Sequence, residues 1–334
     1  MEDPKISVLV SCIAELTSGA RCREGENGEY LPFDSGIRMG IKWGIEVFGC
    51  CYGFVLLRDV NKFNKCVLML WNPTTDECKR IPNPPAGTKG EDRNYEEYGF
   101  GYSEGIEDFK VVHLTEALQE GLCEVQVYTL KSNSWRRADN VEIYDIYWHQ
   151  MSDEVRRPTG GAAHWLAHVE SSIEGHCIAR FEFESEEFDA TSLPVSTDLP
   201  PTLCALGGSV CFFIRDLFDV ITIWELKNNV VEKSWNKLFA IDLTKTFGSV
   251  YGFIPLKSLR NGKIVVGLQL NKAELHIVLY DPKHGTVETL KVHESMVPTD
   301  YIFVYEEHLH SLGTGTHLAQ LKGKTRMLVK KNKI

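Results

Sequence analysis

Residues 125–135 read VQVYTLKSNSW, and this stretch decides the fold. Val125 and Val127 alternate with a polar residue up to the aromatic Tyr128, a polar turn follows, and Trp135 comes seven positions later. Such alternation is typical of a strand with one buried face. An odd offset across a tight turn places Tyr128 and Trp135 opposite each other on one face of the sheet, where cross-strand pairs stabilise a hairpin.

The same pattern occurs four more times along the chain. The aromatic residue and its apolar counterpart are Trp71 with Cys78, Phe181 with Phe188, Trp224 with Val231, and Tyr280 with Val287. The aromatic residues follow one another at intervals of roughly 50 residues, and a second strand-like stretch precedes each hairpin. Repeats of this length with about four strands are typical of propeller blades. The sequence therefore predicts an all-β, propeller-like array of antiparallel blades. Five hairpins are explicit, and strands near 41–57 and 301–312 raise the expected number to about six to seven blades.

The composition excludes several classes of protein. The chain has 334 residues, 43% of them apolar and 25% charged, with a net charge of −10. A negative chain is poorly suited to phosphate backbones, and no apolar run is long enough to span a membrane, so we expect neither a nucleic-acid nor a membrane partner. The ten cysteines form no C-x-x-C pair and the start is unlike a signal peptide, which favours reduced thiols and a cytoplasmic and/or nuclear location.

Longer motifs around these hairpins resemble the plant F-box-associated domain (type 1, kelch-like). Six motifs occur in the family's order, at 47–54 (VFGCCYGF), 70–82 (beginning LWNPTT), 98–112 (beginning YGFGY), 125–136, 160–166 and 181–194. The resemblance implies a β-propeller-like module that recognises the protein substrate of an SCF-type ubiquitin ligase. It further implies that the F-box of such proteins docks onto a Skp1-type adaptor.

The resemblance also suggests how the chain is divided. Residues 1–46 are rich in glycine and contain no helical run of the F-box kind. We therefore predict an irregular segment at 1–40 in which no F-box is recognisable, an F-box-associated propeller at 41–318 and a basic C-terminal tail at 319–334. The expected partner is a protein substrate or peptide, and a Skp1/cullin ligase only if an F-box is supplied.

One insertion is the predicted partner-binding site. Residues 141–158 form the longest insertion between repeats and carry Tyr144, Tyr147, Trp148, His149, Arg156 and Arg157. Tyr, Trp and Arg dominate binding hot spots, and loops on a rigid scaffold commonly carry function. The alternative is that these aromatic residues pack beneath their own loop. The acidic run at 182–189 alternates with phenylalanine, which indicates a hairpin with one solvated face. Docking of a basic segment there is the alternative.

Three motifs contain residue types used in catalysis or in metal binding. GYSEG at 101–105 fits the G-x-S-x-G nucleophile motif, but a turn and a second strand follow it instead of a helix, which favours a hairpin. His164 and His168 on one strand lie about 13 Å apart, too far to share a zinc ion. His308 and His310 lack a third ligand. We therefore predict a non-catalytic recognition module with no catalytic residue, metal or cofactor. The alternatives are a hydrolase on a propeller scaffold and a carbohydrate-binding propeller.

Overall fold

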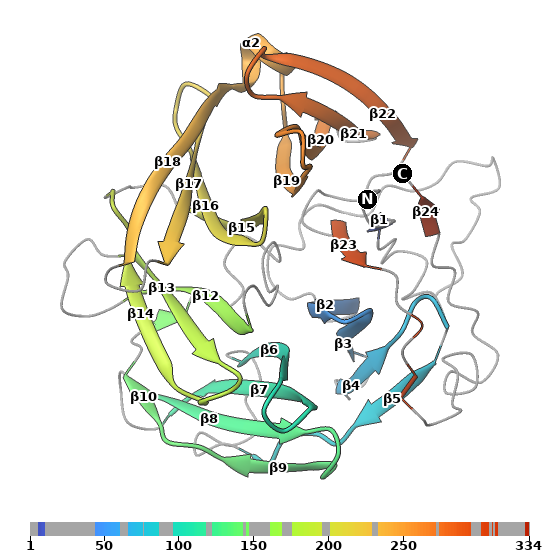
Figure 1. Ribbon diagram of the computed structural model, residues 1–334, viewed down its shortest axis with the longest axis vertical. Coiled ribbons are helices and arrows are strands. Elements are labelled where there is room, and N and C mark those ends of the chain that lie inside the picture. The colour runs from blue at the N-terminus through green and yellow to red at the C-terminus, as the bar shows by residue number, and fades with distance from the viewer. Residues whose placement is uncertain are drawn as a thin grey trace, which may run out of the picture.

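The protein folds into a ring of antiparallel sheets around a central axis, an all-β propeller (Figure 1). The computed structural model describes residues 6–10, 44–60, 66–75, 77–86, 96–117, 122–142, 145–146, 161–168, 176–195, 201–228, 233–271, 274–294, 302–306, 309, 311–312 and 331–333. A short helix, α2 (Leu243–Phe247), follows the fourth blade. The predicted fold class is confirmed.

Five blades make up most of the ring, each with its strands in sequence order from one edge to the other. The first blade contains β2 (Gly44–Cys51), β3 (Phe54–Val60), β4 (Cys66–Trp71) and β5 (Cys78–Ile81). The second contains β6 (Glu96–Ser103), β7 (Asp108–Glu116), β8 (Leu122–Thr129) and an outer edge split into β9 (Ser134–Arg137) and β10 (Val141–Glu142). The third contains β11 (Asp145–Ile146), β12 (Ala162–His168), β13 (His176–Glu182) and β14 (Phe188–Ser192). The fourth contains β15 (Thr202–Leu206), β16 (Ser209–Arg215), β17 (Val220–Asn228) and β18 (Lys233–Asp242). The fifth contains β19 (Gly252–Ser258), β20 (Ile264–Asn271), β21 (Glu274–Asp281) and β22 (Thr286–Glu294).

A smaller sheet between the fifth and first blades brings the two ends of the chain together (Figure 1). Its middle strand, β1 (Ile6–Val10), pairs antiparallel with both β23 (Ile302–Glu306) and β24 (Lys331–Lys333). Part of the segment expected to be irregular and part of the expected basic tail are therefore strands. The alternating Ile6, Val8 and Val10 suit a strand, and β1 covers an edge of β23 that would otherwise be unpaired.

The expected number of six to seven blades is corrected to five. The strands expected near 41–57 add no blade, because β2 and β3 pair in sequence with β4 and so complete the first blade. The strand expected near 301–312 is β23, which belongs to the three-stranded sheet.

Four of the five predicted cross-strand pairs are confirmed. They are Trp71 with Cys78, Tyr128 with Trp135, Phe181 with Phe188, and Tyr280 with Val287. The fifth prediction is wrong, since Trp224 pairs with Lys237. In that blade β17 continues to Asn228, because the buried Leu226 extends the hairpin and pairs with Trp235. The register also shifts next to Trp224, so no fixed offset of seven holds there.

The hydrophobic core lies between neighbouring blades. Tyr128 packs in a cluster shared by the first and second blades, Phe181 in one shared by the second and third, and Tyr280 in one shared by the fourth and fifth. All three rings are at most 5% exposed. The repeated aromatic residue therefore stabilises the contact between sheets, which is how a propeller buries surface that a single blade would leave in water.

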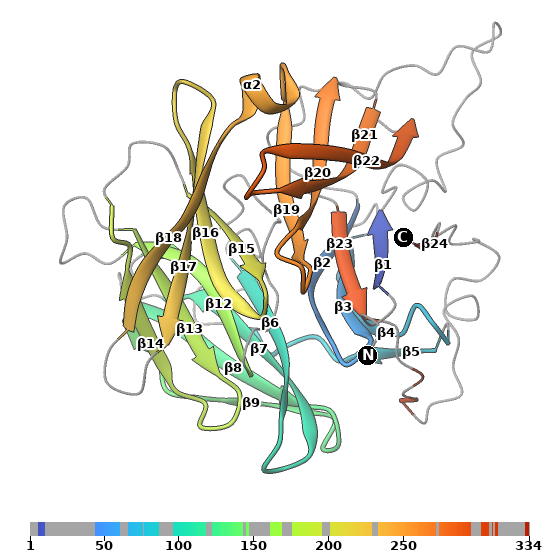
Figure 2. The same ribbon diagram turned by 45° about the horizontal axis from the view of Figure 1, so that its top comes forward.

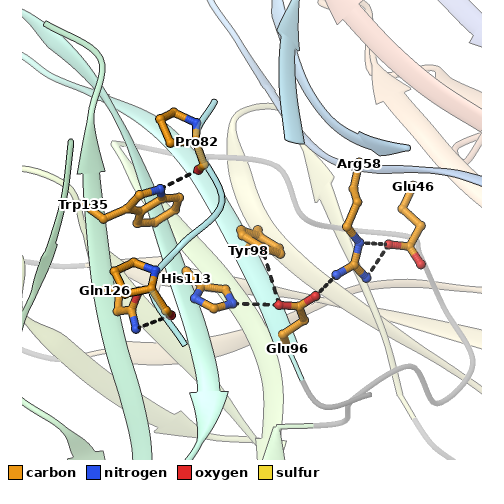
Figure 3. A network of polar contacts seen from close by, with 9 residues as sticks. Glu46, Arg58, Pro82, Glu96, Tyr98, His113, Gln126 and Trp135 are labelled. Atoms are coloured by element: carbon orange, nitrogen blue, oxygen red, sulfur yellow. Dashed lines mark hydrogen bonds and ion pairs between the residues drawn. The ribbon is translucent and has the colours of Figure 1, made fainter. Parts of the chain in front are cut away.

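Two tryptophans on outer strands connect one blade to the next. Trp135 Nε1 on β9 donates a hydrogen bond to the Pro82 carbonyl just after β5, at 2.7 Å (Figure 3). Trp235 Nε1 on β18 donates to the Ser192 carbonyl at the end of β14, at 2.8 Å. In both cases the indole binds the end of the preceding blade's outer strand, so the second blade is held to the first and the fourth to the third.

We expect Trp135→Phe to lower the free energy of unfolding by about 0.5–1 kcal/mol, because the ring still packs while the hydrogen bond to Pro82 is lost. Urea unfolding followed by circular dichroism measures the change. Trp235→Phe is the matched variant and should have a similar effect. Two variants as stable as the wild type would show that these indole bonds contribute nothing.

Candidate functional site

The six residues predicted to bind a partner, Tyr144, Tyr147, Trp148, His149, Arg156 and Arg157, lie outside the described residues. Their role stays a prediction. The segments on either side are strands, since β10 pairs with β8 in the second blade and β11 pairs with β12 in the third. Part of the expected insertion therefore belongs to the blades themselves.

The G-x-S-x-G motif forms a hairpin, as the sequence predicted. β6 ends at Ser103, which pairs with Asp108 at the start of β7. Ser103 is buried, and its hydroxyl donates a hydrogen bond to Glu184 Oε2 at 2.8 Å. The hydroxyl therefore holds two turns together, and it is both buried and engaged by a carboxylate.

The histidine and cysteine side chains considered for chemistry form no catalytic or metal-binding group within the described residues. His164 and His168 lie on β12, in register with Arg180 and His176 on β13, and His308 and His310 lie outside the described residues. Burial raises the pKa of Cys177 to about 11, which keeps its thiol protonated and a poor nucleophile. Among the residues that the structure describes, no three His, Cys, Asp or Glu side chains are grouped to hold a metal ion.

One end of the first three blades presents aromatic and acidic side chains together. The turn after the first strand in the first two blades and the turn between the third and fourth strands in all three blades lie at this same end, because consecutive strands are antiparallel. We call this region the acidic turn surface and define it by Tyr52, Tyr102, Glu104, Ile106, Glu107 and Glu184. Contacts between these turns join all three blades.

The aromatic part begins at the turn between β2 and β3. Tyr52 and Gly53 both have positive φ, 47° and 80°, as a two-residue type I′ hairpin turn requires. The Tyr52 ring is 42% exposed and stands edge-on to Tyr102 of the second blade, with ring centroids 5.1 Å apart. Its hydroxyl donates a hydrogen bond to Glu104 Oε1 at 3.1 Å, which raises the pKa of Tyr52. Tyr52 also makes a T-shaped contact with Phe109, so the side chain is held in place while part of it stays exposed to solvent.

The acidic part comes from the turn between β13 and β14. The Glu184 carboxylate accepts hydrogen bonds from the Gly105 amide at 3.0 Å and from the Ser103 hydroxyl, and these bonds lower its pKa. Glu186 forms ion pairs with Lys110, at 2.8 Å, and with Arg136. The predicted hairpin is confirmed, but its acidic face is not simply solvated. The turn reaches the second blade, so Glu184 and Glu186 bind across the gap between sheets.

The pKa of Glu184 leads to a pH prediction. A carboxyl whose pKa is lowered in the folded state stabilises that state above its unfolded pKa, and this contribution disappears as the pH falls through the folded pKa. We expect Glu184→Gln to reduce the loss of melting temperature that begins near pH 5 and continues below about pH 4, so melting is followed from pH 7 to about pH 3. Glu187→Gln removes a charge from the same turn and is the control. An unchanged pH dependence in Glu184→Gln would contradict the assigned role of the hydrogen bonds.

A buried charged network joins the first and second blades (Figure 3). Arg58 on β3 lies between two carboxylates, with Nη2 2.5 Å from Glu46 Oε2 and Nη1 paired with Glu96 of β6. Glu96 also accepts a hydrogen bond from the Tyr98 hydroxyl at 3.2 Å and lies 2.9 Å from His113 Nε2. Sequence reasoning missed this group. The available signal was an arginine that directly continues the apolar run 53–57.

The strand order and the turns place the protein in the class of β-propellers. The protein is a five-bladed β-propeller with aromatic and acidic side chains on the exposed turns of its first three blades. The chain belongs to the F-box associated beta propeller domain family, whose match covers residues 34–312. The family predicted from the sequence motifs is therefore confirmed.

Curated relatives come from Arabidopsis thaliana. The chain is 28% identical to F-box protein CPR1 over 283 residues, which cover 77% of this chain and 65% of that protein. It is 28% identical to F-box protein At4g22390 over 246 residues, covering 68% of this chain and 60% of that protein. The chain thus spans less than two thirds of the length of these relatives. Among solved structures, TolB from Acinetobacter baumannii gives a TM-score of 0.43 at 12% identity over 75% of this chain and 56% of that one, too low to support an argument.

No helix in the described part of the chain is long and apolar enough to cross a membrane.

Proposed function

We propose that this propeller is the protein-recognition module of an SCF-type ubiquitin ligase substrate receptor. The observation that carries the proposal is the family match across residues 34–312, together with relatives that are named F-box proteins. In this role the propeller binds a protein substrate and performs no chemistry. A Skp1-type adaptor and its cullin are engaged through an F-box where one is supplied. Cytoplasm and/or nucleus, where thiols stay reduced, is the proposed location.

We further propose that the acidic turn surface contacts the substrate. Tyr52 and Ile106 are 42% and 47% exposed, and Glu104 and Glu107 stand beside them in the first turn of the second blade. A tyrosine face attracts a lysine or arginine side chain, and nearby carboxylates strengthen that attraction. The favoured substrate segment is therefore basic with at least one apolar anchor. The residues predicted within 141–158 remain a proposed second part of the binding site.

The test uses proximity labelling in plant cells that express the chain with an added F-box. Substrates should be labelled, become less abundant when the F-box is present, and recover when the proteasome is inhibited. The double variant Glu104→Lys, Ile106→Ser should reduce labelling of the same proteins by about tenfold, because a desolvated anchor and a favourable charge are both lost.

A matched control separates the two parts of the proposal. Leu290→Ser changes another partly exposed apolar residue, on the outer strand of the fifth blade, and should leave labelling unchanged. If the labelled proteins keep their abundance in the presence of the F-box, the receptor role is wrong. If the Glu104 and Ile106 double variant labels them as well as the wild type does, the receptor role stands but the substrate binds elsewhere.

The hydrolase alternative has no support from the described site, because the motif serine is buried in a turn contact. Ser103→Ala should therefore alter stability and not an esterase rate. Measurable hydrolysis of p-nitrophenyl acetate that disappears in Ser103→Ala would revive that alternative. Binding of a sugar on a glycan array, lost in Tyr52→Ser, would favour the carbohydrate-binding alternative.

A further inference from the structure

Three large apolar side chains are exposed at the opposite end of the fourth blade. Leu217 and Phe218 lie in the turn between β16 and β17 and are 86% and 85% exposed, and Tyr251, just before β19, is 61% exposed. β16 starts at the turn equivalent to Tyr52–Gly53 and ends at this one, so the two surfaces lie at opposite ends of the propeller. Figure 2 shows the β16–β17 turn next to α2 at the edge of the molecule. We call these three residues the apolar ridge.

Arg215 holds the two parts of the ridge together. Its Nη2 donates hydrogen bonds to Asp219 Oδ1 at 2.8 Å and to the Val250 carbonyl at 2.7 Å, and its Nη1 lies 3.5 Å from the Tyr251 carbonyl. The turn that carries Leu217 and Phe218 is thus tied to the segment that carries Tyr251. The backbone segments that carry the three exposed apolar side chains are therefore held next to each other by one arginine.

The turn itself is fixed by its own polar groups. Asp216 Oδ1 accepts hydrogen bonds from the Phe218 and Val220 amides, both at 2.9 Å. Asp219, at φ 62°, is fixed from outside the turn, because its carbonyl accepts a hydrogen bond from the Leu243 amide at 2.9 Å and its carboxylate accepts one from the Thr244 hydroxyl. A rigid turn loses little conformational entropy on binding, so exposed apolar side chains on it are efficient anchors.

The charges around the ridge decide what kind of partner fits it. Asp216 and Asp242 are exposed, and Asp242 pairs with Val220 beside the turn. Arg215 is engaged by Asp219 and by carbonyl groups. Among the described residues around the ridge, Lys245 is the exposed side chain with a positive charge. The rim is therefore mainly negative and favours basic groups on a partner.

We propose that the apolar ridge binds a segment of a partner protein in which apolar side chains are flanked by lysine or arginine, and a Leu/Lys helix serves as its probe. This goes beyond substrate recognition, since the ridge lies at the other end of the propeller. A second copy of the chain is a poorer occupant, because each copy carries a net charge of −10. An anionic membrane is poorer for the same reason, since its surface repels the carboxylates around the ridge.

The test measures fluorescence anisotropy of the full chain with a labelled model peptide, an amphipathic Leu/Lys helix of about 15 residues. We expect the peptide to bind at physiological salt, and expect Leu217→Ser and Phe218→Ser each to weaken binding by about tenfold. A Leu/Glu peptide with the same apolar face should bind at least about tenfold more weakly than the Leu/Lys peptide. Leu309→Ser is the control, because Leu309 is 82% exposed elsewhere, and it should leave binding unchanged. Melting temperatures of the variants confirm that each is folded.

Four outcomes would overturn the proposal. Equal peptide binding by Phe218→Ser and the wild type would show that only the net charge of the chain attracts the peptide. Equal binding of the Leu/Lys and Leu/Glu peptides would show that the carboxylates around the ridge do not select a basic partner. Analytical ultracentrifugation tests for self-association, and self-association that Phe218→Ser abolishes would assign the ridge to a second copy of the chain. Sedimentation with phosphatidylcholine/phosphatidylserine vesicles that Phe218→Ser abolishes would assign it to a membrane.

Discussion

Replacing Arg58 with methionine should lower the free energy of unfolding by about 3–5 kcal/mol, the range expected when one partner of a buried ion pair is removed. Arg58 is 4% exposed and its guanidinium lies between Glu46 of its own blade and Glu96 of the next. Methionine keeps much of the packing against Phe48 and Tyr98, whose rings lie 5.2 Å and 5.7 Å from the guanidinium carbon. The decrease in the free energy of unfolding therefore measures mainly the loss of the ion pairs of Arg58 with Glu46 and Glu96. Urea unfolding at pH 7 measures it.

The companion variants separate charge from shape. Glu96→Gln in the Arg58→Met background removes one of the two carboxylates left without their cation, so the double variant should be more stable than Arg58→Met alone. Arg58→Lys should recover only part of the stability, because an ammonium group cannot match two carboxylates as a planar guanidinium does. If Arg58→Met lowers the free energy of unfolding by less than about 1 kcal/mol, the network is not what holds the first two blades together.

The blade hairpins were predictable because the information that determines them is local. Tyr128 and Trp135 are separated by one turn, and a strand period of two places them on one face without knowledge of any other blade. The prediction was wrong at Trp224, where the turn comes later in the sequence than the residue types suggested. The number of blades was also wrong, because a strand pattern does not show whether β2 opens a new blade or completes the blade of Trp71.

The contacts between blades were not predictable in the same way. Glu184 and Gly105, or Arg58 and Glu96, meet only because two repeats lie side by side in the ring, and no local pattern specifies that pairing. The acidic run at 182–189 therefore appeared to be a solvated hairpin face. The acidic turn surface combines turns from three blades, so its composition became visible only once the order and direction of the strands were known.

The largest steric effect is expected at Gly101, where alanine should lower the free energy of unfolding by about 2–3 kcal/mol. A methyl group there would overlap the edge of the Phe183 ring, which reaches β6 from the third blade. Gly99 on the same face of β6 is also crowded, since its Cβ would lie 2.6 Å from that of Ala163. The Y-G-F-G-Y motif thus has two glycines because the second and third blades approach too closely for any side chain. Thermal and urea unfolding measure the effect.

A second glycine and a double variant show whether crowding is the cause. Gly208→Ala meets nothing within 4 Å and changes only a turn at φ 82°, so it measures the cost of backbone strain alone, about 1 kcal/mol. Gly101 is not restricted in that way, because it lies within a regular strand. Phe183→Leu should therefore offset part of the damage in Gly101→Ala although it destabilises the wild type, a coupling that arises only if the two side chains compete for the same space. Additive effects of the two changes would contradict this, because the second and third blades would then tolerate the methyl group by moving apart.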